Sequence, residues 1–223
     1  MRSRQVLDRT TTPDGKALEL ALEHGFHILR VDGVPLMSSG MRGSEEAMAS
    51  VASAELGPRR APRILIGGLG MGYTLRAVLD TFGDSASVCV AELMPAIIEY
   101  NRGVLGALAD HPLGDPRVEL YRGDVRRCFE RRAWDAILMD VDNGPSALTV
   151  RSNRSLYGPR GLSRMTDALA PGGVLIVWSA FQSPGFLEEL RRTGLSPSAL
   201  PIRARWPERK GPMHTLFVAL RPR

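Results

Sequence analysis

The chain has 223 residues, 43% of them hydrophobic and 24% charged, with a net charge of +5. This composition is typical of a globular protein with one sizeable core, and it excludes disordered, collagen-like and membrane-spanning proteins. Two cysteines are too few for a disulfide framework, and no apolar leader segment is visible, so we expect a cytoplasmic protein with no membrane partner.

The positive charge is concentrated at the C-terminal end. Residues 191–223 hold eight arginines and lysines against Glu208 alone, and the rest of the chain is slightly acidic. Such a surplus is found in proteins that bind nucleic acid. Because only two of the 29 cationic residues are lysines, a generally arginine-rich, solvated surface explains the surplus at least as well.

Taken in chain order, the first 58 residues predict a small subdomain. Residues 26–37 have the alternation of a half-exposed β-hairpin, with a turn signal at Asp32 and Gly33. A helix is expected over residues 43–56, with a serine cap and two glutamates in its first turn. We therefore expect residues 1–58 to form a hairpin and helix cap.

Residues 59–223 predict a second domain, in which short apolar runs alternate with amphipathic stretches. The expected strands are 63–67, 87–92, 117–121, 134–140, 173–178, 200–205 and 213–220. The expected helices are 73–82, 95–108, 125–131, 161–169 and 184–192. Buried strands alternating with helices indicate an α/β fold, a Rossmann-like doubly wound seven-stranded sheet with helices on both faces. The last two strands are expected to be antiparallel.

The first strand of this domain ends in a glycine-rich loop, Gly67-Gly-Leu-Gly-Met-Gly72. Ligands of open α/β sheets bind at the carboxyl ends of the strands, where glycines let the backbone approach a nucleoside closely. The spacing fits neither the dinucleotide pattern GxGxxG nor the phosphate loop, which needs a lysine. A nucleoside site is therefore expected at this loop, and a purely structural turn is the alternative.

An acidic residue lies at the end of each of the next three strands. Glu92 can accept hydrogen bonds from a ribose diol, and Asp124 can accept from an adenine amino group. Asp140 closes the fourth strand. Each acid alone fits a helix cap or a turn, but the carboxyl ends of parallel strands meet at one edge, so we expect the three acids to share one site.

The order of these motifs resembles that of the spermidine synthase (polyamine aminopropyltransferase) family, a branch of the class I S-adenosylmethionine-dependent methyltransferase superfamily. The segments that carry the resemblance are IGGLGMGYTLRAVLD, AELMPAIIEYNR, DPRVELYRGDVRRCF, WDAILMDVDNGPSALT, LYGPRGL and LAPGGVLIVWS. The resemblance implies a methyltransferase-type sheet, a site for S-adenosylmethionine or its decarboxylated form, and a homodimer.

The resemblance also implies a role for each motif. The cofactor-binding residues that it implies are Gly67, Gly68, Gly70, Gly72, Glu92, Leu93, Gly123, Asp124, Val125 and Asp140. It makes Asp140 the catalytic acid that orients or deprotonates an attacking amine, with Asp142 or Asn143 as its helper. No metal site is expected, because the four histidines are scattered without ligand spacing.

Several positions depart from the family pattern. Gly70 stands where the family has an aspartate that holds the aminopropyl ammonium of decarboxylated S-adenosylmethionine, and Leu36 falls near the family's hairpin glutamine. Residues 43–46 replace a Tyr-His-Glu segment, and Asn143 replaces a second acid. Because a buried ammonium without a carboxylate is costly, these changes favour methyl transfer from intact S-adenosylmethionine to an amine or hydroxyl of a small acceptor.

Three alternatives stay open. The first is aminopropyl transfer from decarboxylated S-adenosylmethionine, as the resemblance implies, and the second is a non-catalytic nucleoside-binding homologue. The third, an RNA-modifying enzyme, is disfavoured because it rests only on the basic tail.

Aromatic and cationic residues near the expected site bear on the acceptor. Trp178 and Phe181 follow a strand end, where they could line an acceptor pocket or pack in the core. The loop that carries Trp206, Arg209 and Lys210 is expected to form a cationic rim on the cofactor side of the sheet, suited to an anionic small molecule.

Overall fold

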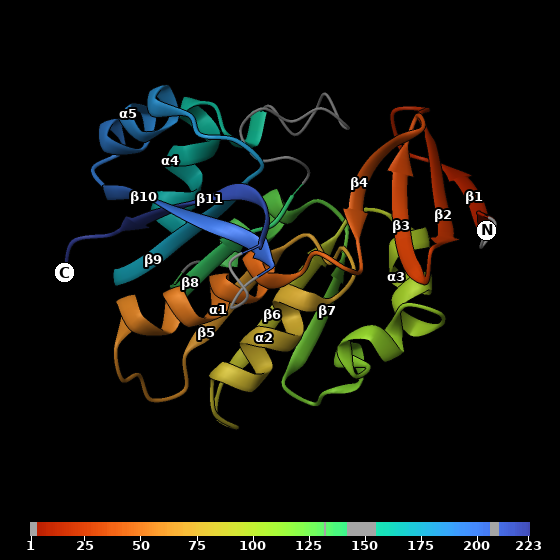
Figure 1. Cartoon of the computed structure of the whole chain (residues 1–223). Helices are drawn as coiled ribbons and strands as arrows, with labels where there is room; N and C mark the ends of the chain where they lie inside the picture. The colour runs from red at the N-terminus through yellow and green to blue at the C-terminus, as the bar shows by residue number, and fades with distance from the viewer. Residues whose placement is uncertain (1–3, 132, 142–154, 206–209) are drawn as a thin grey trace.

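The computed structural model describes residues 4–131, 133–141, 155–205 and 210–223. Their strands form two sheets, one of four strands and one of seven (Figure 1). The larger sheet carries the expected α/β fold, and the smaller one lies at the N-terminal end of the chain. The fold class that the sequence predicts is therefore confirmed.

The seven-stranded sheet has the strand order β10-β11-β9-β8-β5-β6-β7. Its strands are β5 (Arg63–Gly67), β6 (Ser87–Glu92), β7 (Val118–Arg122), β8 (Trp134–Met139), β9 (Leu169–Ser179), β10 (Ser196–Arg205) and β11 (Lys210–Leu220). The five neighbouring strands β9, β8, β5, β6 and β7 are parallel to one another. Strand β11 runs antiparallel to both β9 and β10. The carboxyl ends of β5, β6 and β8 therefore meet at one edge, as the sequence predicts.

Helices cover both faces of this sheet. They are α1 (Gly43–Leu56), α2 (Tyr73–Thr81), α3 (Pro95–Arg102), α4 (Pro159–Ala168) and α5 (Pro184–Arg192), with 3-10 turns η1 (Gly106–Ala109), η2 (Pro112–Gly114) and η3 (Val125–Arg131). Successive strand residues face opposite sides, so Ile64 and Ile66 belong to a core with α1, α2 and α3, while Leu65 belongs to a second core with α4 and α5.

The N-terminal sheet is larger than the sequence predicts. It contains β1 (Gln5–Thr11), β2 (Ala17–Glu23), β3 (Phe26–Val31) and β4 (Val34–Ser38), each antiparallel to its neighbours in chain order. The hairpin of β3 and β4 is the expected one. The first two strands were not expected, because most side chains of β1 are exposed and its hydrophobic alternation is weak.

Helix α1 differs most from the expected arrangement. It packs against α2, β9 and β10, and Met48, Ala49 and Ala52 are fully buried there. The helix therefore belongs to the layer that covers the seven-stranded sheet, and the cap consists of the four strands alone. Two other helices differ from the prediction. The helix expected over residues 95–108 ends at Arg102, before Gly103, and the segment 125–131 is a 3-10 helix.

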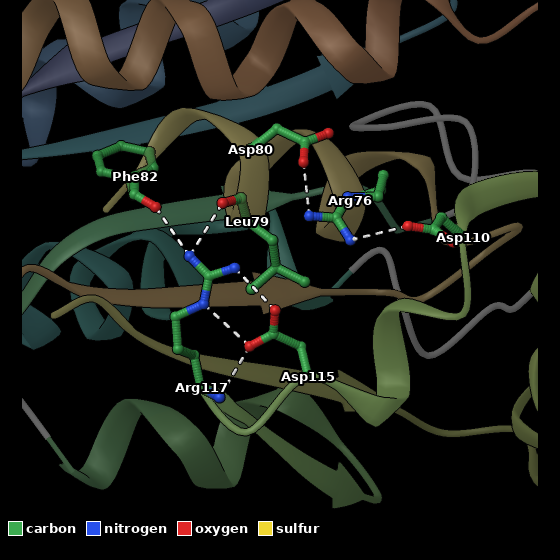
Figure 2. Close-up of polar contacts among 7 residues, drawn as sticks. All are labelled: Arg76, Leu79, Asp80, Phe82, Asp110, Asp115 and Arg117. Carbon is green, nitrogen blue, oxygen red and sulfur yellow. Dashed lines mark hydrogen bonds and ion pairs between the residues drawn. The ribbon is translucent and has the colours of Figure 1, made fainter. Parts of the chain in front are cut away.

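A guanidinium group ties the C-terminal end of α2 to the start of β7. Arg117 Nη1 donates to the carbonyl oxygens of Leu79 and Phe82, each at 2.9 Å, and Asp115 accepts from Arg117 Nε at 2.9 Å (Figure 2). Figure 2 also shows that Arg76 of α2 donates to Asp80, one helical turn further along the same helix. The carbonyls that a helix end leaves unpaired are thereby satisfied. The contact fixes the helix that begins at the glycine loop.

No helix among the described residues is both long and apolar enough to cross a bilayer.

Candidate active site

A cavity of about 430 Å³ lies between the four-stranded sheet and the carboxyl ends of the parallel strands. Its wall on the side of the small sheet is apolar, with side chains such as Leu18, Leu29, Leu36 and Met37. The opposite wall carries the strand-end residues. The expected site residues that line the cavity are Gly68, Gly70, Glu92, Leu93, Asp124, Val125 and Asp140.

The glycine loop is shaped by close approaches that exclude side chains. Gly68 has a φ of +91°, and a Cβ there would lie 2.3 Å from the carbonyl oxygen of Asp140. Gly70 has a φ of +51°, and a Cβ there would lie 2.8 Å from Met37 Sδ of the small sheet. Gly67 and Gly72 shape the turn without lining the cavity. The loop is thus both a required turn and a wall of the cavity.

Glu92 is the buried acid beside this loop. Its Oε2 accepts from the Leu69 amide at 2.9 Å, and its Oε1 accepts from the Met94 amide at 2.8 Å. Burial raises the pKa of Glu92, and these backbone hydrogen bonds oppose the rise. Each oxygen of a carboxylate has a second acceptor site. The amides of Leu93 and Gly70 also interact with this carboxylate, so Glu92 holds the loop, and a ribose diol would share its acceptor sites with the backbone.

Asp124 lines the cavity next to Val125, but its carboxylate already has a partner. Arg126 Nε donates to Asp124 Oδ2 at 2.8 Å, and the Arg126 amide donates to Oδ1 at 2.9 Å. Although burial would raise the pKa of Asp124, the hydrogen bonds from Arg126 lower it. The expected adenine contact therefore depends on the acceptor sites that Arg126 leaves. Gly123 does not line the cavity.

Asp140 lies directly after β8 in the wall of the cavity. Its Oδ2 accepts a hydrogen bond from Thr74 Oγ1 at 2.7 Å. Burial raises the pKa of Asp140 to about 6. The proposed helpers Asp142 and Asn143 lie outside the described residues.

Glu45 is a cavity acid that sequence reasoning missed. It is only 5% exposed, and it faces the same cavity as Asp140. Burial raises the pKa of Glu45 to about 8, and the negative charge of Asp140 adds to the rise. In the sequence it is one of two glutamates in a helix first turn, and nothing local distinguishes the one that is buried. The cavity therefore contains two carboxyl groups that affect each other's ionisation.

A chain of hydrogen bonds leads from Glu45 to the last strand. Ser44 Oγ lies 2.6 Å from Glu45 Oε2, 2.8 Å from His214 Nδ1 and 3.1 Å from Trp178 Nε1. The rings of Trp178 and His214 pack edge to face, with centroids 4.7 Å apart. Trp178, Phe181 and His214 all line the cavity. The aromatic side chains therefore contribute to the cavity wall, and Trp178 packs in the core as well.

The basic C-terminal end reaches the same edge of the sheet. Because β10 is parallel to β9, the end of β10 at Arg205 lies on the side of the strand ends that hold the cavity. Lys210 begins β11, whereas Trp206 and Arg209 lie outside the described residues. Within the described part of the chain, no cluster of histidine, cysteine or acidic side chains could hold a metal ion.

The strand order of the large sheet defines a methyltransferase-like α/β fold, with the cavity at the carboxyl ends of the parallel strands, where ligands of such sheets bind. No protein-family model matches the chain, and no curated protein matches it. Two solved structures similar to it are a spermidine synthase from Thermotoga maritima and a spermidine synthase in complex with the transition-state analogue AdoDATO.

Both similarities extend over nearly the whole chain. The Thermotoga maritima enzyme gives a TM-score of 0.76 at 19% identity, and the AdoDATO complex gives 0.75 at 18% identity. Each comparison covers 97% of this chain and 72% of the other. The chain therefore has the fold of the spermidine synthases, as the motif order in the sequence indicates.

Proposed function

We propose that the protein transfers an alkyl group from the sulfonium centre of an S-adenosylmethionine-type nucleoside to an amine. The leading form of this proposal is aminopropyl transfer from decarboxylated S-adenosylmethionine. It is supported by the spermidine synthase fold and by the AdoDATO complex of one structural neighbour. These similarities favour aminopropyl transfer over the methyl transfer that the departures from the family pattern indicate.

The described residues fit a nucleoside of this type. The glycines of the loop approach the cavity without side chains, and Glu92 lines the same cavity, where its carboxylate is an acceptor for a ribose diol. Leu93, Met94 and Val125 supply apolar contacts for a purine. When bound, such a nucleoside supplies a carbon next to a sulfonium, which a nucleophile can attack.

The observation that carries the proposal is the pair of carboxyl groups formed by Glu45 and Asp140. Two interacting acids titrate as a pair, and their raised pKa values, about 6 and about 8, leave one negative charge between them near neutral pH. An ammonium group in this apolar cavity is stabilised by that charge. The pair can hold an amine and take its proton as the new bond forms. Holding both reactants in line supplies much of the acceleration.

Methyl transfer from intact S-adenosylmethionine is the second candidate, and one contact favours it. The space that a side chain at Gly70 would need is filled by Met37 of β4. Gly70 itself offers no carboxylate to hold the ammonium of a decarboxylated donor. The carboxylate of the intact donor is compatible with backbone amides of the loop.

Product masses distinguish the two candidates. The full chain is incubated with either nucleoside and with a series of monoamines and diamines, and the amine products are identified by mass spectrometry. We expect the gain of one aminopropyl group with the decarboxylated donor. A methylated amine from the intact donor would establish the second candidate, and consumption of neither donor would contradict alkyl transfer.

A further inference from the structure

Ser44 has more hydrogen-bond neighbours than its single proton can serve. A serine hydroxyl donates one hydrogen bond and accepts two. Its Oγ has three neighbours, and Trp178 Nε1 can only donate. The two remaining neighbours are Glu45 Oε2 at 2.6 Å and His214 Nδ1 at 2.8 Å. Ser44 can donate to one of them only, so the other must donate to Ser44.

Two arrangements of protons satisfy this requirement. When Glu45 is ionised, Ser44 donates to the carboxylate, and His214 Nδ1 carries a hydrogen that it donates to Ser44. When Glu45 carries its proton on Oε2, this hydroxyl donates to Ser44, Ser44 donates to His214 Nδ1, and the imidazole hydrogen lies on Nε2. The ionisation of Glu45 and the tautomer of His214 are therefore linked.

The surroundings favour a neutral imidazole in both arrangements. Burial lowers the pKa of His214, and a neutral ring has the one donor and one acceptor nitrogen that both arrangements need. The titratable groups that act on Glu45 are Asp140 after β8 and Glu46 on its own helix. Burial raises the pKa of Tyr73 of α2 to about 12, and the nearby charge of Glu45 adds to the rise. His214 remains partly exposed and lines the cavity, so it has access to space outside the hydrogen-bond chain.

We propose that Ser44 and His214 form a relay that removes a proton from Glu45 after the Glu45 and Asp140 pair has taken up the proton lost by the attacking amine. This inference rests on the proposed function, since N-alkylation of an ammonium releases one proton in each turnover. Near neutral pH the Glu45 and Asp140 pair already holds one proton. A second proton from the amine would leave the pair neutral and unable to bind the next ammonium.

The relay moves one proton from Glu45 to water and needs no further reactant. The proton on Glu45 Oε2 passes to Ser44 Oγ while the Ser44 proton passes to His214 Nδ1, and the proton on His214 Nε2 leaves to water. Glu45 is then ionised, and His214 is neutral with its hydrogen on Nδ1. Before the next turnover His214 gains a proton from water on Nε2 and loses the one on Nδ1 to water, so the ring again has an unprotonated Nδ1. Ser44 and His214 are thus positioning residues that act through Glu45, which touches the amine.

The tautomer of His214 tests the linkage without any substrate. In protein labelled with ¹⁵N-histidine, we expect Nδ1 of His214 to change from an unprotonated to a protonated nitrogen as the pH rises from 7 to 9 (~2 units, centred on the raised pKa of a buried carboxyl). The variant His214→Phe assigns the signal, and Glu45→Gln should abolish the change. A single tautomer across this pH range in the wild type would overturn the relay.

Kinetics test the role of the relay in turnover. We expect His214→Ala to lower kcat at least about tenfold (~1.4 kcal/mol in the barrier), with little change in KM for the nucleoside, and added imidazole to restore part of kcat. His24→Asn is the matched control, because His24 is an exposed turn residue with a φ of +49° that asparagine tolerates.

The two proposals fail in different ways. An unchanged kcat and pH profile in His214→Ala, in a wild type that turns over, would overturn the relay and leave the proposed function intact. Absence of alkyl transfer by the wild type with every amine and either donor would overturn the proposed function, whatever the tautomer measurement gives.

Discussion

Gly68 shows how one residue links the fold to the site. Its backbone has a φ of +91°, and a Cβ would lie 2.3 Å from the carbonyl oxygen of Asp140, a distance that backbone atoms cannot relieve cheaply. We predict that Gly68→Ala destabilises the protein by about 2–4 kcal/mol, because steric strain adds to the cost of the left-handed conformation. Denaturant unfolding measures this loss.

Gly83→Ala is the control for that substitution. A Cβ at Gly83 has nothing within 4 Å, and its φ is not in the left-handed region. We expect a change in stability of less than about 1 kcal/mol for the control. Equal losses in the two variants would contradict the assigned role of Gly68.

Glu45 should make the protein less stable as the pH rises. Its pKa in the folded protein, about 8, lies above the ordinary value of 4.5, so between these values the folded state binds more protons than the unfolded state. The free energy of unfolding therefore falls with increasing pH in this window, by up to about 1.4 kcal/mol per pH unit. Asp140, whose pKa is raised to about 6, contributes to the slope below that pH, so Glu45→Gln should remove the slope between about pH 6 and pH 8 and stabilise the protein at pH 8.

Urea unfolding at pH 5, 7 and 8 (within the window about 4.5 to 8 set by the raised pKa) tests this prediction. Glu55→Gln on the same helix is the control, because Glu55 is exposed. If Glu45→Gln and the wild type lose stability in parallel as the pH rises, then Glu45 is not the group that titrates.

The two acids that the sequence predicts, Glu92 and Asp140, are positioned by the sheet, whereas Glu45 is positioned by a helix that packs on it. Glu92 and Asp140 follow buried strands, and a parallel sheet brings such strand ends together whatever the rest of the chain does. Glu45 reaches the cavity because α1 packs on β9 and β10, and His214 reaches it because β11 pairs between these two strands; both are tertiary arrangements. The sequence pattern predicts that residues 43–56 belong to the N-terminal cap, so it does not predict that Glu45 lies near Asp140.

At the level of elements, Arg117 connects α2 to β7. It donates to two carbonyls at the end of α2 and is held by Asp115, and its side chain is only 16% exposed. We predict that Arg117→Ala lowers the free energy of unfolding by about 2–3 kcal/mol, because charged hydrogen bonds are lost and carbonyls are left unpaired. Arg117→Lys should lose about half as much, since lysine lacks the planar fork.

Thermal or urea unfolding of three variants checks this contact. Arg102→Ala is the control, because Arg102 forms an exposed ion pair with Glu99, and such pairs contribute about 0–1 kcal/mol. A loss for Arg117→Ala no larger than that of the control would contradict the role of Arg117 in fixing α2.

Element boundaries were predicted where a local signal ends the element. Pro95 begins α3 and the glycine loop ends β5, and both boundaries follow from residue type. The predicted end of the helix over residues 95–108 was wrong, because the apolar spacing continues past Gly103, where α3 has already ended. The α-helix predicted over residues 125–131 is a 3-10 helix, which has the same apolar pattern over so short a segment. Strands β1 and β2 pair across the small sheet. Most side chains of β1 are exposed, and the alternating leucines of β2 stand among alanine and glutamate, which favour helix.

At the scale of the whole molecule, the contact between the two sheets bears on the choice of donor. Met37 of the small sheet fills the space beside Gly70 of the large one. We predict that the double variant Met37→Ala, Gly70→Asp gains at least about tenfold preference for the decarboxylated nucleoside (~1.4 kcal/mol), because the new carboxylate can pair with its ammonium. Aspartate tolerates the left-handed conformation at this position.

Titration calorimetry with both nucleosides measures this preference. Gly70→Asp alone is the matched variant, and we expect it to bind either nucleoside poorly because the aspartate meets Met37 Sδ. An unchanged donor preference in the double variant would mean that position 70 does not contact the end of the donor where the two nucleosides differ.

The central claim is that the carboxyl groups of Glu45 and Asp140 hold the amine that is alkylated. The most direct test compares kcat/KM for the amine in the wild type, Asp140→Asn, Glu45→Gln and the control Glu55→Gln. We expect losses of at least about a hundredfold for the two cavity variants (~2.7 kcal/mol) and a wild-type value for the control. Wild-type kcat/KM in both Asp140→Asn and Glu45→Gln would contradict it.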